Sequence, residues 1–232
     1  MTMQIALRAK DGLVVASDTK IRTTEQEFPA KEYSPFGIVN SSKVRVSKRH
    51  DILVALEGGG VGESDPAQQM VDYLSSEHEV PDGLSELLGK WGNRYFEAKF
   101  QGQKHEFPLF RLLVVNPPTG YLPFWKLRVR QTSTCQSSST FMVNGNDSNS
   151  AIFWPEYFKC DKQLHDLPTT VRIAALTILM GSQLNPYGVG GLEIWKYDHT
   201  WIAVTPTQIE TLKQEFRGFE ESSMRSFVSA KA

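Results

Sequence analysis

The sequence of 232 residues contains only two cysteines, Cys135 and Cys160, and no long apolar run. Two cysteines cannot supply the four ligands of a structural zinc site, and we expect both to be free thiols in a reducing compartment. The longest nearly apolar stretch, residues 173–180, is far short of the roughly 20 residues that a membrane-spanning helix needs. Arg8 interrupts the first apolar stretch, so no secretory signal is indicated. We therefore expect a cytoplasmic protein that does not enter a membrane.

The sequence also has no excess of charge of either sign, because it contains 25 Lys and Arg residues and 26 Asp and Glu residues. A net charge of −1 without basic clusters argues against a nucleic-acid partner. The sequence has no G-x-x-x-x-G-K-[ST] loop, no complete dinucleotide fingerprint, no G-x-S-x-G elbow and no H-E-x-x-H pair. The five histidines show no metal-ligand spacing. We therefore expect neither a cofactor nor a metal.

The order of elements that the apolar patterning predicts is strands, two helices, strands, two helices, strands and a final helix. Strands are expected at residues 3–6, 13–16, 43–46, 52–56, 110–115, 121–129, 141–143, 192–195 and 201–204, and helices from Pro66, over 84–100, from about Ser148, over 169–184 and from Pro206. Residues 23–42 and 131–140 are expected to be extended loops. Segregated blocks of this kind favour an α+β fold with antiparallel sheets, and the length favours a single domain over residues 1–232.

The first predicted hairpin gathers polar side chains at its open end. With a three-residue turn at residues 10–12, Gln4 faces Asp18 and Thr2 faces Lys20. Because side chains alternate along a strand, these four residues are predicted to share one face. A polar patch at this place is either a solvated strand edge or a site.

The Met1-Thr2 start favours the site. Methionine before a small residue is normally removed, which would leave Thr2 with a free α-amino group. That amine, with an ordinary pKa of about 7.7–8.0, can accept the proton of the threonine hydroxyl near neutral pH. A nearby lysine would lower the pKa of the amine, and an aspartate would hold the lysine in place.

Two blocks of the sequence resemble proteasome β-type subunits and the related bacterial ATP-dependent threonine protease. Residues 2–20 share their leading threonine, a K-D-G turn, an apolar strand and a D-x-[RK] ending. Residues 43–59 are similar to their K-V-R strand followed by an apolar strand and a Gly-containing turn. Residues 144–147 and 185–191 resemble, more loosely, their G-S-G and D-x-x-S-G-G motifs.

This resemblance implies the Ntn-hydrolase fold, a four-layer αββα sandwich, and threonine-type hydrolysis of amide bonds. Carried over to this sequence, Thr2 is the nucleophile, Asp18 orients the site and Lys43 tunes the threonine amine. The backbone N–H of Gly58 binds the oxyanion. Lys20 and Lys31 are rivals of Lys43, because the link before Lys43 is longer than in the family.

The sequence departs from the family at three positions of the expected site, one of which is Gly188 or Val189, where the family has serine. Asn146 stands where the family has serine, and Asn185 stands where it has aspartate. The alternatives are therefore a catalytically silent scaffold or binding subunit of the same fold, and an Ntn amidase that acts on a small molecule.

The resemblance also implies partners. The implied substrates are peptides or unfolded proteins. The implied partners are further copies of the chain, in a ring or another homo-oligomer, with an ATP-driven unfoldase as an optional further partner. The aromatic stretch of Trp91, Tyr95 and Phe96 is predicted to lie at a subunit interface, because aromatics are enriched in interface cores.

Overall fold

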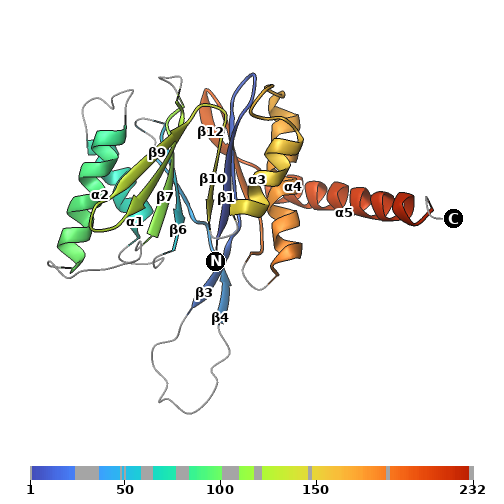
Figure 1. Cartoon of the computed structure of the whole chain (residues 1–232), viewed down its shortest axis with the longest axis horizontal. Helices are drawn as coiled ribbons and strands as arrows, with labels where there is room; N and C mark the ends of the chain where they lie inside the picture. Colours follow the sequence, from blue (N-terminus) through green and yellow to red (C-terminus); the bar gives the residue numbers. More distant parts are fainter. Residues whose placement is uncertain are drawn as a thin grey trace, which may run out of the picture.

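Two five-stranded antiparallel sheets face each other in the computed structural model (Figure 1). The structure describes residues 2–23, 37–47, 49, 51–58, 65–76, 84–100, 110–117, 122–145, 148–186 and 189–229. The first sheet has the order β10 (Phe141–Gly145), β1 (Met3–Arg8), β2 (Leu13–Ser17), β11 (Glu193–Asp198) and β12 (Thr200–Ala203). The second has the order β5 (Val44–Val46), β6 (Leu53–Glu57), β7 (Phe110–Val115), β8 (Phe124–Val129) and β9 (Thr134–Ser138).

Helices cover the outer face of each sheet (Figure 1). Helices α1 (Pro66–Ser76) and α2 (Ser85–Phe100) pack on the second sheet, and α3 (Ser148–Tyr157) and α4 (Leu167–Leu184) pack on the first. Helix α5 (Pro206–Ser229) contacts α4 and projects away from the sheets (Figure 1). The prediction of an α+β fold built on antiparallel sheets is confirmed.

Three hydrophobic cores follow from the alternation of side chains along the strands. Ile5 and Val14 point to the core under α3 and α4, whereas Ala6 and Val15 point to the core between the two sheets. The third core lies between the second sheet and helices α1 and α2. Because both faces of the central strands are covered, β2 and β6 are buried along their whole length.

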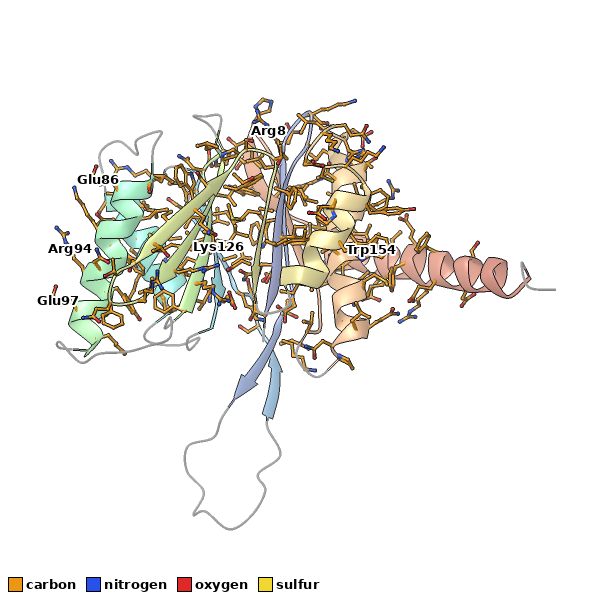
Figure 2. All side chains as sticks on the ribbon, in the orientation of Figure 1. Arg8, Glu86, Arg94, Glu97, Lys126 and Trp154 are labelled. Carbon is orange, nitrogen blue, oxygen red and sulfur yellow. The ribbon has the colours of Figure 1, made fainter. Side chains whose placement is uncertain are left out.

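Helices α1 and α4 each begin at an aspartate cap. Charged side chains of α2 lie on its solvent side. Asp65 accepts from the backbone N–H of Ala67 at 2.9 Å at the start of α1, and Asp166 accepts from Thr169 at 2.8 Å at the start of α4. The labelled side chains of α2 point away from the sheet in Figure 2; they are Glu86, Arg94 and Glu97.

The register of the first hairpin differs from the prediction by one residue. Gln4 faces Ser17 rather than Asp18, and Arg8 faces Leu13, so the turn has four residues. The φ of Gly12 in this turn is not positive, so no left-handed conformation requires a glycine there. Gly12 is required for a different reason: a Cβ there would lie 2.2 Å from the carbonyl oxygen of Tyr197 on the neighbouring strand. The shared face predicted for four polar residues is therefore wrong.

Both stretches predicted to be loops contain strands. Residues 23–42 begin in β3 (Lys20–Thr23) and end after β4 (Gly37–Asn40), which pair as a two-stranded ribbon. Residues 24–36 lie outside the described residues. Within residues 131–140, β9 pairs with β8 at the edge of the second sheet. The alternation of apolar residues does not reveal this strand, because an edge strand needs little apolar surface and β9 is rich in Ser and Thr.

The aromatic residues predicted to form an interface belong to the chain's own core. Trp91 and Phe96 are 7% and 4% exposed. The Tyr95 ring lies 5.0 Å from that of Phe110 on β7, centroid to centroid. The predicted location of the interface is therefore wrong: these aromatic side chains fill the core between α2 and the second sheet.

None of the helices in the described ranges has the length and apolar character to cross a bilayer.

Candidate active site

Three of the predicted site residues meet at one end of the two sheets. Thr2 immediately precedes β1, Asp18 follows β2, and Lys43 precedes β5. The Lys43 ammonium donates to Thr2 Oγ1 at 3.1 Å and to both carboxylate oxygens of Asp18 at 2.9 Å. An ammonium group has three N–H donors, and these three contacts use all of them.

The backbone locks Asp18 in place beside the first strand. Asp18 Oδ1 accepts from the backbone N–H of Met3 at 2.8 Å, and the Asp18 N–H donates to the Met3 carbonyl at 3.0 Å. Asp18 is thus held opposite Met3, so its carboxylate lies next to Thr2 although the hairpin register is not the predicted one. The Asp18 carboxylate therefore binds both the backbone at the start of β1 and the Lys43 ammonium.

Burial has the largest effect on the pKa values of Asp18 and Lys43. Thr2 and Lys43 are 5% exposed and Asp18 is fully buried. Burial lowers the pKa of Lys43 and raises the pKa of Asp18, while the ion pair between them opposes both shifts. The lysine therefore loses its proton more readily than an exposed lysine.

Glu193 anchors the backbone of Lys43, and sequence reasoning missed it. Its Oε1 accepts from the Lys43 backbone N–H at 2.9 Å, and its Oε2 accepts from Ser42 Oγ at 2.7 Å. Burial raises the pKa of the Glu193 carboxyl, and these two hydrogen bonds oppose the rise. The available signal was a carboxylate between the apolar residues Leu192 and Ile194 at the start of a strand.

Gln4 was not assigned to the site, and it connects the strand of Thr2 to the other sheet. Its side-chain Nε2 donates to the carbonyl of Leu56 at 2.9 Å, and its Oε1 accepts from Asn144 Nδ2 at 2.8 Å. The Leu56 N–H donates to the carbonyl of Lys43 at 3.0 Å. Leu56 is thus bonded on one side to the lysine and on the other to β1. The signal was a polar residue between the apolar residues Met3 and Ile5 of a strand, and the structure shows that Gln4 is fully buried.

Gly58 lies two residues beyond Leu56, directly after β6 ends at Glu57. Its φ is 76°, in the left-handed region where glycine is favoured. The hydrogen bonds of Leu56 therefore hold this glycine turn at the same end of the sheets as Thr2 and Lys43.

A second glycine allows close packing against Thr2. Gly145, at the end of β10, has φ of 125°, and a Cβ there would lie 2.0 Å from the carbonyl oxygen of Thr2. Any side chain at this position would displace the start of β1. The close approach explains why the strand needs glycine there.

The other predicted residues are not part of the three-residue contact. The Lys20 ammonium donates to the carbonyl of Pro186, at 2.5 Å. Asn185 ends α4, where its N–H donates to the Gly181 carbonyl at 2.9 Å. Asn146 and Lys31 lie outside the described residues.

Neither cysteine is a reactive nucleophile. Cys135 and Cys160 are free, and burial raises the pKa of each thiol to about 11, so both are protonated near neutral pH. In the described ranges, His, Cys, Asp and Glu side chains form no group of three or more that could hold a metal ion.

The two facing sheets, with helices on the outer face of each, have a proteasome-like fold. Solved structures of several proteins share it. The chain is similar to Anbu (ancestral beta-subunit) from Yersinia bercovieri, with a TM-score of 0.68, 12% identity and 97% of each chain covered. An Anbu (Gly-1) mutant from Hyphomicrobium sp. strain MC1 gives the same score and identity over 98% of this chain and 97% of that chain.

A shorter protein is also similar. BPH from Thiobacillus denitrificans, solved in complex with epoxomicin, gives a TM-score of 0.56 and 14% identity, over 84% of this chain and 98% of that chain. A scan of family models and a search of curated proteins return no match to the sequence. At these identities the comparisons show the fold alone.

Proposed function

We propose that this chain is a proteasome-like N-terminal threonine hydrolase that cleaves peptide bonds once Met1 has been removed. The observation that carries the proposal is the buried contact of Lys43 with Thr2 Oγ1 and with both oxygens of Asp18. The finer architecture that we propose with it is the four-layer αββα sandwich of Ntn hydrolases.

In the proposed reaction, the α-amine of Thr2 takes the hydroxyl proton as Oγ1 attacks the carbonyl carbon of the scissile bond. The carbonyl oxygen becomes an oxyanion, which the Gly58 N–H binds, a contribution of roughly 3–4 kcal/mol to the barrier in comparable sites. The C–N bond then breaks, the leaving amine takes the proton, and an ester remains on Thr2. Water hydrolyses that ester with the same amine as base.

Lys43 and Asp18 have supporting roles in this proposal. The positive charge of Lys43, hydrogen-bonded to Oγ1, lowers the pKa of the nearby amine and so keeps it unprotonated near neutral pH. Asp18 balances the charge of the lysine and fixes its position.

The proposal includes partners and a place of action. The substrates are peptides or unfolded proteins, the chain forms a ring or another homo-oligomer in the cytoplasm, and an ATP-driven unfoldase delivers substrate. The epoxomicin complex of the Thiobacillus denitrificans protein supports an epoxyketone as the first inhibitor to try.

A silent scaffold subunit is the second candidate. Asn146 and Asn185 favour it, since each replaces a residue that the family uses around the threonine amine. An asparagine can donate and accept hydrogen bonds but supplies no charge.

The experiment is turnover of a panel of fluorogenic peptides by the wild type, Thr2→Ala and Thr2→Ser. We expect Thr2→Ala to abolish hydrolysis with little change in melting temperature, and Thr2→Ser to retain part of it, because serine keeps the hydroxyl. Undiminished hydrolysis by Thr2→Ala rules out the assignment. A wild type that cleaves no amide and retains Met1 favours the scaffold.

A further inference from the structure

Lys43 lies on a segment that has little strand pairing of its own. It comes between β4, which pairs with β3 in a two-stranded ribbon, and β5, which has only three residues. A two-stranded ribbon is marginally stable by itself. The backbone of Lys43 therefore depends on contacts with the two large sheets.

The backbone N–H and the backbone carbonyl of Lys43 are bound by different sheets. The carbonyl accepts from the N–H of Leu56 on β6, in the second sheet, at 3.0 Å. The N–H donates to Glu193 Oε1 on β11, in the first sheet, at 2.9 Å. The bond to Leu56 joins backbone atoms, so of these two bonds only the one to Glu193 can be removed by a substitution.

The position of Glu193 on β11 explains how it reaches the lysine. Glu193 is the first residue of β11 and pairs with Ser17, the residue before Asp18. Ile194 belongs to the core under α3 and α4, and side chains alternate, so Glu193 faces the space between the sheets. Asp18 thus binds the ammonium end of Lys43, and Glu193 binds its backbone end.

Both oxygens of the Glu193 carboxylate bind this segment. While Oε1 accepts from the Lys43 N–H, Oε2 accepts from Ser42 Oγ at 2.7 Å. Two bonds to consecutive residues fix the carboxylate and the chain in one relative orientation. The lysine side chain therefore starts from a defined point on its way to Thr2.

Glu193 also acts on Lys43 through its charge. Burial lowers the pKa of Lys43, and three carboxylates oppose that shift: Asp18 after β2, Glu193 on β11 and Glu57 on β6. Burial raises the pKa of Glu193, and its hydrogen bonds and the charge of Lys43 oppose that rise. Glu193 therefore favours the protonated form of Lys43, which is the form that donates to Thr2 Oγ1.

We propose that Glu193 is a positioning residue of the candidate active site, which holds the Lys43 ammonium at Thr2 by fixing the Lys43 backbone. This inference rests on the proposed function and adds a residue to it, because Glu193 acts on the reaction through Lys43. The ammonium lies 3.1 Å from Thr2 Oγ1, and a displacement of about 1 Å at such a contact can cost about 10²-fold in rate.

The test compares peptide hydrolysis by the wild type, Glu193→Ala and Glu193→Gln. Glu193→Ala removes both hydrogen bonds, and it lowers kcat at least about 30-fold while KM changes less than about threefold. Glu193→Gln keeps an acceptor for the Lys43 N–H, and its amide NH2 donates to Ser42 Oγ, whose own hydrogen goes to the Val44 carbonyl, 3.2 Å away. This variant therefore retains kcat within about fivefold of the wild type.

The pH profile gives a readout that a merely structural role would not move. Glu193→Gln removes a negative charge near Lys43, so the alkaline fall of kcat/KM moves to lower pH by about half a unit. Glu215→Gln is the matched control, because it removes the same charge from an exposed pair with Arg172 on the helical side of the molecule. It leaves kcat, KM and the profile unchanged.

The Lys43 amine can also be followed without hydrolysis. Trace acetic anhydride acetylates neutral amines, and peptide mapping by mass spectrometry gives the acetylation of Lys43 relative to that of the exposed Lys159 at one pH near neutrality. Glu193→Gln raises this ratio about threefold, which corresponds to the half-unit shift. Glu193→Ala raises it further, because the backbone of the lysine is also released.

Three results overturn the inference. They are a Glu193→Ala variant with the kcat of the wild type, a Glu193→Gln variant that loses as much as Glu193→Ala, and an alkaline fall that Glu193→Gln leaves in place. If Glu193→Ala fails to fold, the pH profile and the acetylation ratio of Glu193→Gln decide the question.

The two proposals fail in different ways. Hydrolysis that requires Thr2 but is the same in the wild type and both Glu193 variants overturns the role of Glu193 alone. A wild type that hydrolyses no peptide, together with a raised acetylation ratio in both variants, overturns the hydrolase and leaves Glu193 as the residue that positions Lys43.

Discussion

Lys43 has the central position among the site residues, since its ammonium reaches both Thr2 and Asp18. The resemblance to proteasome subunits identified this lysine by its context, and spacing along the chain left Lys20 and Lys31 as rivals. The Lys20 ammonium instead donates to the carbonyl of Pro186. Of Lys20 and Lys43, therefore, only Lys43 contacts Thr2 in the described residues.

The first prediction separates the two lysines. Lys43→Ala should lower kcat/KM for peptide hydrolysis at least 10²-fold, because the Thr2 amine loses the charge that lowers its pKa. Lys20→Ala is the matched control and should change the rate less than about threefold. Circular dichroism of each variant checks folding. If Lys20→Ala shows the larger loss, the assignment of the lysine is wrong.

The second prediction concerns the pH profile of hydrolysis. Burial lowers the pKa of Lys43, so its charge is lost as pH rises, before the ordinary value of 10.5 is reached. A neutral lysine no longer gives Thr2 Oγ1 a charge-assisted hydrogen bond, so the alkaline side of the kcat/KM profile should fall below pH 10.5. Lys43→Arg should move that fall to higher pH, because a guanidinium keeps its proton. An alkaline side that is identical in both proteins contradicts the role of Lys43.

At the scale of elements, local patterning predicted most strands and helices, because alternation and helical spacing reflect burial directly. It failed at β9, where an edge strand carries polar residues, and at the hairpin register, where Gly12 lies close to the backbone of Tyr197. Local sequence contains no signal for such contacts between distant segments. For the same reason it missed Gln4 and Glu193, whose bonding partners lie far along the chain.

The third prediction tests the role of the aromatic residues of α2. Trp91→Ala should lower the free energy of unfolding by about 3–5 kcal/mol, because it empties part of the core. Leu184→Ala, at a side chain that is 68% exposed at the end of α4, should change it by less than about 0.5 kcal/mol. Urea unfolding at one protein concentration measures both. A Trp91→Ala variant with wild-type stability but a smaller particle mass restores the interface interpretation.

At the scale of the whole molecule, large apolar side chains remain exposed on the helical side of the first sheet. Phe153 and Tyr157 on α3 are 55% and 65% exposed, and Phe219 on α5 is 51% exposed. The Phe153 and Tyr157 rings stack with centroids 6.0 Å apart. We propose that the exposed ring pair on α3 is where another subunit packs.

The fourth prediction is a homo-oligomer of roughly six or more subunits by light scattering at micromolar concentration, the closed assembly that the proposal requires. Tyr157→Asp should lower the particle mass, because it places a charge on the exposed aromatic surface. A wild type that remains a 26.1 kDa monomer over this range contradicts the ring and favours a free-standing amidase.

The central claim is that Thr2 is an N-terminal nucleophile, and mass spectrometry after incubation with an epoxyketone tests it most directly. The account predicts that the wild type has lost one methionine, that it gains the mass of one inhibitor molecule, and that peptide mapping locates the adduct at Thr2. Thr2→Ala, treated in parallel, should gain nothing. Retained Met1 with no adduct at Thr2 would contradict the account.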